Sequence, residues 1–161
     1  MANPMQDWLP EGVYDLLPVY GRNIRDLGMA YLLAIVIGWN REKESQGAGL
    51  RTFPLVAIAS CGFVQISEGM MDDNPEATAR VVAGVITGIG FIGAGAIMKG
   101  GSEIHGTATA ASIWATGAIG AAVALGSYHV AVTVCLFTVV TLYLVTPLKP
   151  HDDRGAGEGE A

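Results

Sequence analysis

The chain has 161 residues, which is enough for a single domain. Hydrophobic residues make up 51% of it and charged residues only 15%, against about a quarter in soluble domains, so the composition excludes an ordinary soluble protein. The net charge of −6 and the lack of a Lys/Arg cluster exclude nucleic acid as a partner.

Hydrophobic runs predict an all-α fold, a polytopic membrane helix bundle of about five transmembrane helices, because a spanning helix needs about 20 apolar residues. The first run, 27–39, is short, so we expect its helix to start near Asn23 and to include Arg25 and Asp26. Neighbouring residues do not face each other on a helix, so we expect these charges to reach outward separately rather than pair. The other expected spans are 50–67, 81–98, 107–125 and 130–145.

Two flanking segments complete the expected organisation. Residues 1–22 mix apolar and acidic residues between prolines, which is typical of a short interfacial segment ahead of a transmembrane domain at 23–146. Residues 147–161 alternate glycine with charged residues and predict a disordered cytoplasmic tail. Six of the nine basic residues fall on one side of the predicted spans, so we expect the N-terminus outside and the C-terminus in the cytoplasm.

The most distinctive stretch is a glycine-rich run at 84–95. Its Gly88, Gly90 and Gly93 match the GxGxxG string of dinucleotide sites, but the flanks are one continuous apolar helix, so we reject that function. Small residues four apart let helices approach closely, which predicts a helix-packing face. A break in the helix near Gly93–Gly95, exposing backbone carbonyls to a cavity, is the alternative.

A second candidate region joins the first two spans. Arg41 and Glu42 end the first, and Arg51 and Thr52 begin the second. The helix dipole disfavours an arginine at a helix start, so we expect Arg51 to be held by a carboxylate, Glu42 or Glu103, or by a phosphate group. An ordinary positive-inside anchor is an equal interpretation.

Hydroxyl side chains mark the start of the fourth span. We expect Thr107 or Thr109 to cap this helix. Thr109, Ser112 and Thr116 lie three or four residues apart on one face, where they can hydrogen-bond to a neighbouring helix. Lining a polar cavity is the alternative role.

We expect neither a bound cofactor nor an enzymatic activity. The chain holds no Ser/His/Asp or Cys/His set and no P-loop. Asp72, Asp73 and Glu76 form a small acidic cluster, and hard cations take oxygen ligands, so Mg²⁺ is retained as a candidate ligand or signal. Ordinary solvated loop charge is the other interpretation of this cluster.

Several separate blocks together resemble the membrane domain of the MgtC/SapB family. The matching blocks are Gly38–Glu42, Ala48–Thr52, Arg80, Gly88–Gly95, and Gly106 with Thr109–Trp114. They occur in the family's order and span about residues 27–145. The sequence given ends at Ala161, so we expect the membrane domain without the family's cytoplasmic C-terminal domain.

The resemblance implies an inner-membrane protein linked to Mg²⁺ homeostasis or transport and, in pathogens, to survival inside macrophages. It also implies an alternative, a regulatory membrane subunit that binds and modulates another complex, such as the ATP synthase, without transporting ions. Besides the lipid bilayer, a second copy of the chain and another membrane protein are the expected partners. The matching positions are functional candidates: Arg41, Glu42, Arg51, Thr52, Gly88, Gly90, Gly93, Gly95 and Thr109.

Three positions depart from the family pattern. Asn40 stands where many members have Glu, His105 where Arg is usual, and Ala108 where a polar residue is common. The expected spans offer hydroxyls and glycine backbone but no carboxylate at mid-membrane depth. Because Mg²⁺ sheds its waters reluctantly, such a small uncharged bundle is a poor carrier unless it oligomerises, which favours the regulatory alternative.

Overall fold

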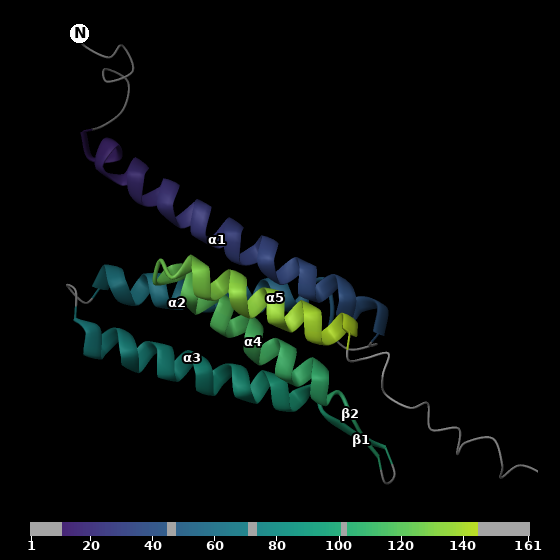
Figure 1. Cartoon of the computed structure of the whole chain (residues 1–161). Helices are drawn as coiled ribbons and strands as arrows, with labels where there is room; N and C mark the ends of the chain where they lie inside the picture. The colour runs from purple at the N-terminus through teal and green to yellow at the C-terminus, as the bar shows by residue number, and fades with distance from the viewer. Residues whose placement is uncertain (1–10, 45–47, 71–73, 101–102, 145–161) are drawn as a thin grey trace, which may run out of the picture.

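Five helices and one short hairpin make up the computed structural model, which describes residues 11–44, 48–70, 74–100 and 103–144. The elements are α1 (Glu11–Glu44), α2 (Thr52–Met70), α3 (Pro75–Gly95), β1 (Met98–Gly100), β2 (Glu103–His105), α4 (Thr107–Ala124) and α5 (Tyr128–Leu144) (Figure 1). Among the described residues, α2, α3 and α4 are long and apolar enough to cross a membrane, and α5 is apolar but shorter. The all-α membrane bundle is confirmed; the antiparallel β1–β2 hairpin was not predicted.

The first helix is longer than the sequence suggested. It begins at Glu11 and continues through Pro18 for 34 residues, so residues 11–22 belong to the same helix as the first span. Pro18 removes one backbone N–H from the helix, which nevertheless continues through it. The N-terminal part of α1 stands away from the other helices (Figure 1). Its placement at the membrane interface stays a prediction, and the expected tail at 147–161 lies outside the described residues.

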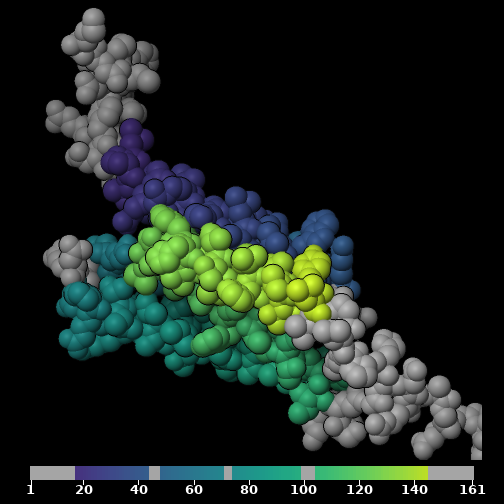
Figure 2. Space-filling view, viewed as in Figure 1, coloured from purple at the N-terminus to yellow at the C-terminus, as the bar shows by residue number. Residues whose placement is uncertain are grey.

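Helix α4 is the centre of the bundle, because small residues let every other helix approach it. It packs against α1, α2, α3 and α5, and α5 lies over it on the face seen in Figure 2. A Cβ added at Gly120 would overlap the carbonyl oxygen of Ala57 on α2, and one at Gly117 would overlap Ile89 on α3. These two glycines therefore set the distance from α4 to its two neighbours.

Helix α3 lies at the edge of the bundle. Asn74 caps it, its side chain accepting hydrogen bonds from the backbone N–H of Glu76 and Ala77 at 3.1 and 3.2 Å. Within this helix only Ile89 and Gly93 are buried. Most of its apolar surface thus faces outward.

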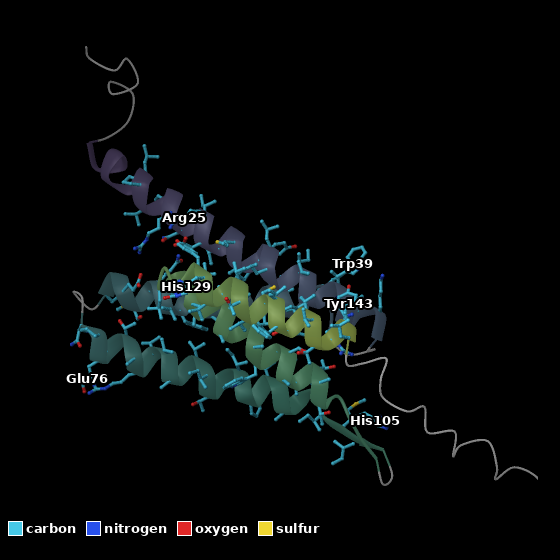
Figure 3. All side chains as sticks on the ribbon, viewed as in Figure 1. Arg25, Trp39, Glu76, His105, His129 and Tyr143 are labelled. Atoms are coloured by element: carbon cyan, nitrogen blue, oxygen red, sulfur yellow. The ribbon has the colours of Figure 1, made fainter. Side chains whose placement is uncertain are left out.

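Helices α1 and α5 run parallel and in step. The Tyr128 hydroxyl lies 2.8 Å from an Asp26 carboxylate oxygen, and the Cys135 sulfur lies 3.4 Å from the Leu33 carbonyl oxygen, each pair 102 residues apart. Figure 3 places Arg25, His129 and Glu76 at one end of the bundle, which we call the Arg25 end. The same view places Trp39, Tyr143 and His105 at the opposite end, which we call the Trp39 end.

Candidate functional site

The Trp39 end collects most of the predicted functional residues. Helices α1, α3 and α5 end there, and α2 and α4 begin there (Figures 1 and 3). The candidates that the fold brings to this end are Arg41, Glu42, Arg51, Thr52, Gly93, Gly95 and Thr109. Gly88 and Gly90 lie further along α3, toward the middle of the bundle.

Arg41 is a buried cation. Ala30, Ala34 and Ile37 form the core-facing stripe of α1, and the helical spacing of three and four residues continues this stripe to Arg41. The residue is 6% exposed, and its Nε has no hydrogen-bond partner. No described carboxylate forms an ion pair with it. A buried charge without a counter-charge costs several kcal/mol, so this site has an unmet need for an anion.

Glu42 is hydrogen-bonded to the backbone and not to Arg51. Its carboxylate accepts a hydrogen bond from the Leu50 N–H at 2.9 Å. A Cβ at Gly49 would overlap this carboxylate, and a Cβ at Gly38 would lie 3.2 Å from the Gly49 carbonyl oxygen. The two glycines therefore let the corner before α2 fold back against α1. Of the candidate partners of Arg51, Glu42 therefore forms no ion pair with it in the described residues, because its carboxylate is bonded to the backbone before α2.

Arg51 and Thr52 stand at the start of α2. Arg51 is exposed and Thr52 is half-buried. The first turn of α2 holds no acidic residue. The side chain of Glu103, the other expected partner of Arg51, is not among those described.

The start of α4 has no side-chain cap. The N-cap residue is Gly106, which has a φ of 85° and gives no capping hydrogen bond, so the prediction that Thr107 or Thr109 caps the helix is wrong. Thr109 is 5% exposed. Ser112 and Thr116 donate to carbonyl oxygens one turn earlier in α4, at 2.7 and 2.8 Å, and not to a neighbouring helix as predicted. Close packing explains this, since hydroxyls on a crowded helix reach their own backbone first.

The glycines of α3 point in different directions. Gly93 faces α4, where an added Cβ would lie 3.3 Å from the Ala110 carbonyl oxygen. Gly88 and Gly95, seven residues apart, share one side with Gly84, and Gly90 lies on another; a Cβ on any of these four would meet nothing within 4 Å. The helix runs unbroken from Pro75 and ends at Gly95, and of these five glycines only Gly93 packs against another helix of the described bundle.

A groove separates α2 from α3 on the Gly88 side of α3. Its volume is about 460 Å³, and we call it the α2–α3 groove. Its lining is almost entirely apolar: Val56, Ala59, Ser60, Phe63, Val81, Gly84, Val85, Gly88, Ile89 and Ile92. Gly84 and Gly88 hollow it because they bring no side chain to its floor.

A polar cluster at the Arg25 end was not among the predicted sites. Asp26 is 2% exposed and accepts hydrogen bonds from the Arg25 Nε at 2.9 Å, the Tyr128 hydroxyl at 2.8 Å and the Gln65 Nε2 at 3.4 Å. The prediction that Arg25 and Asp26 do not pair is therefore wrong: the long arginine side chain folds back to its neighbour. A carboxylate within a predicted span was the signal that marked this site.

Of the predicted acidic cluster, Asp72 and Asp73 lie outside the described residues, and Glu76 pairs with Arg80 at 2.6 Å. In the part of the chain that the structure describes, no group of three or more His, Cys, Asp or Glu side chains is placed to hold a metal. Cys61 and Cys135 are buried free thiols.

Most of the chain is similar to proteins of one known family. Residues 27–151 match the model of the MgtC family. Protein SrpB of Synechococcus elongatus is 36% identical over 151 residues, 86% of this chain and 76% of that protein. Protein MgtC of Brucella abortus is 37% identical over 76% of this chain and 50% of its own length, and protein MgtC of Salmonella typhimurium is 39% identical over 65% and 44%. The chain thus spans about half the length of these two MgtC proteins. No solved structure matches it.

Proposed function

This chain belongs to the MgtC family, and from that premise we propose that it is a bacterial inner-membrane protein acting in Mg²⁺ homeostasis. In this proposal the N-terminus lies outside, the C-terminus lies in the cytoplasm, and no enzymatic reaction is involved. Mg²⁺ is the ion whose supply the protein helps to maintain, as ligand or as signal. The link to Mg²⁺ rests on the family resemblance.

The geometry favours action through a membrane partner over transport by the single chain. The observation that carries this preference is the open side of α3, where Gly84, Gly88 and Gly95 meet nothing in the described bundle. Small residues on an exposed face let another transmembrane helix approach closely, and close approach is what stabilises helix association within lipid. The regulated partner would be another membrane complex, for which the family resemblance suggests the ATP synthase.

A matched pair of substitutions tests this docking role. Gly88→Leu fills the α2–α3 groove, whereas Gly62→Leu adds the same bulk to α2 outside the residues that line this groove. Each added Cβ points into open space, so both variants are expected to insert and fold. In a strain lacking its own MgtC-family protein, we expect the wild type and Gly62→Leu to restore growth at limiting Mg²⁺, and Gly88→Leu to fail. Full activity of Gly88→Leu would show that no partner docks at the α2–α3 groove.

Flux measurements separate the two modes of action. The purified chain is placed in liposomes that contain a Mg²⁺-sensitive dye, and Mg²⁺ is added outside. We expect no influx above that of empty liposomes while a control for folding is satisfied. Protein-dependent influx would establish direct transport instead. If neither growth nor cellular Mg²⁺ content depends on the protein, the assignment to Mg²⁺ homeostasis fails.

A further inference from the structure

We propose that the Trp39 end of the bundle holds a binding site for a phosphate-type oxyanion, with the Arg41 guanidinium as its central ligand. This inference does not depend on the role in Mg²⁺ homeostasis. It rests on three features: a buried unpaired arginine, two helix N-termini without acidic residues, and further cations beside them.

Arg41 supplies the first feature. At 6% exposure, with an unpartnered Nε, it is the one buried cation of the described bundle. Asp26, the buried carboxylate, lies on the same helix 15 residues away at the other end, where Arg25 and Tyr128 occupy it. A guanidinium in this position gains most from an oxyanion, because its planar fork can donate two parallel hydrogen bonds to it.

The starts of α2 and α4 supply the second feature. The first N–H groups of a helix have no partner within the helix and carry a partial positive charge. The first turns of both helices hold no acidic residue, and Gly106 caps α4 without a side-chain hydrogen bond. Helix starts of this kind bind phosphate and other anions. Both helix starts lie at the same end of the bundle as Arg41, so their partial positive charges favour an anion at this end.

Neighbouring side chains supply the third feature. Arg51 is exposed at the start of α2, and the Lys43 ammonium lies 5.6 Å from the centre of the Trp39 ring. Glu42, the acidic residue adjacent to Arg41 in sequence, is engaged by the Leu50 N–H. Arg51 and Lys43 therefore add positive charge at the same end of the bundle as Arg41.

Depth in the membrane suggests where the phosphate comes from. The 102-residue step between α1 and α5 places Arg41 level with Tyr143, and Trp39 is 55% exposed nearby. Exposed Trp and Tyr residues mark the boundary between lipid tails and head groups. A phospholipid head group and a soluble phosphate compound both meet the chemistry at this depth.

The test uses the full chain, purified in a neutral detergent and freed of lipid. Its thermal midpoint is measured with added inorganic phosphate against chloride at equal ionic strength, and with dioctanoyl-phosphatidylglycerol against dioctanoylglycerol, which lacks phosphate. We expect a concentration-dependent rise with at least one phosphate-bearing probe and none with its control. A rise with the lipid alone identifies a head-group site, and a rise with inorganic phosphate identifies a site for soluble phosphate. No rise with either overturns the proposal.

Substitutions assign the binding to Arg41. Without ligand, Arg41→Gln is expected to unfold at an equal or higher temperature than the wild type, because it removes an uncompensated buried charge. With ligand, Arg41→Gln should lose the rise, and Arg41→Lys, which keeps the charge but not the fork, should bind about tenfold more weakly. Arg80→Gln is the matched control. Arg80 is an exposed arginine on α3 that pairs with Glu76, so this variant should respond to ligand as the wild type does. An equal response in Arg41→Lys and the wild type would overturn the assignment, even if Arg41→Gln does not fold.

Discussion

Asp26 and Arg41 are the two charged side chains buried in the described part of α1, and their surroundings differ. Asp26 has three hydrogen-bond donors around it, from α1, α2 and α5. Arg41 has no described counter-charge. A satisfied buried charge ties helices together, whereas an unsatisfied one disfavours the ligand-free state. Asp26 is therefore a structural centre, and Arg41 is the proposed binding residue.

This difference predicts how Asp26 variants behave. Asp26→Ala leaves Tyr128 and Gln65 without their acceptor, and we expect it to lower the free energy of unfolding by about 2–3 kcal/mol. The exposed Arg25 can turn to solvent, so its lost ion pair adds little. Asp26→Asn keeps one acceptor oxygen and should cost about 1 kcal/mol. The measurement is unfolding in a graded detergent mixture.

Glu76→Gln is the control for the Asp26 variants. It removes an exposed pair between residues four apart on α3 and should change stability by less than about 0.5 kcal/mol. If Asp26→Ala costs no more than this control, Asp26 is not the structural centre that its hydrogen bonds indicate.

At the scale of the helices, glycine has two distinct uses. In α4, Gly117 and Gly120 are filled positions where neighbouring helices lie against the backbone. In α3, Gly84 and Gly88 are open positions that hollow the α2–α3 groove. The same residue type thus builds the interior of the bundle in one helix and shapes its outer surface in another.

Gly120→Ala tests the filled class against Gly62→Ala. The methyl group at 120 would overlap the Ala57 carbonyl oxygen, so we expect a loss of about 1–3 kcal/mol through overpacking. Gly62, on α2, has open space around its Cβ position, and alanine there should gain up to about 1 kcal/mol from helix propensity. Thermal midpoints of the two variants should therefore move in opposite directions. A stabilising Gly120→Ala would show that α2 and α4 can separate without cost.

At the scale of the whole molecule, both ends of the bundle are polar and the middle is apolar. The Arg25 end is closed by hydrogen bonds across α1, α2 and α5. The Trp39 end joins the hairpin, two helix starts and Arg41 (Figure 3). The buried charge at the Arg25 end has hydrogen-bond partners, whereas the buried charge at the Trp39 end has no described counter-charge. Such a difference between the two ends is expected for a protein with a fixed orientation in the membrane.

The orientation itself is a prediction for fusion experiments. Lys and Arg are favoured on the cytoplasmic side, so a green fluorescent protein fused to the C-terminus should fluoresce. Alkaline phosphatase inserted between α2 and α3 should be active, since we expect that loop outside. The reverse pattern for both reporters would place the Trp39 end outside the cell and exclude the inner-leaflet head group as the Arg41 ligand.

The sequence by itself determined the class of protein, the number of helices and the family. Hydrophobic length and scarcity of charge act locally along each span, so they can be read without knowing the neighbours. The family blocks also located Arg41, Gly93 and Thr109 at positions that the fold brings to one end. The start of α1 and the β1–β2 hairpin were not predicted, because a proline-containing amphipathic segment and two short strands have weak local sequence signals.

Only the tertiary structure decided which side chains meet. The rotation of each helix about its axis sends Gly93 toward α4 and leaves Gly88 in the groove, although both belong to one glycine run. The register of α1 against α5 brings Tyr128 to Asp26, and the fold-back of the corner before α2 takes Glu42 away from Arg51. Rotation and register are set by packing across the whole bundle, and no local stretch of sequence contains them.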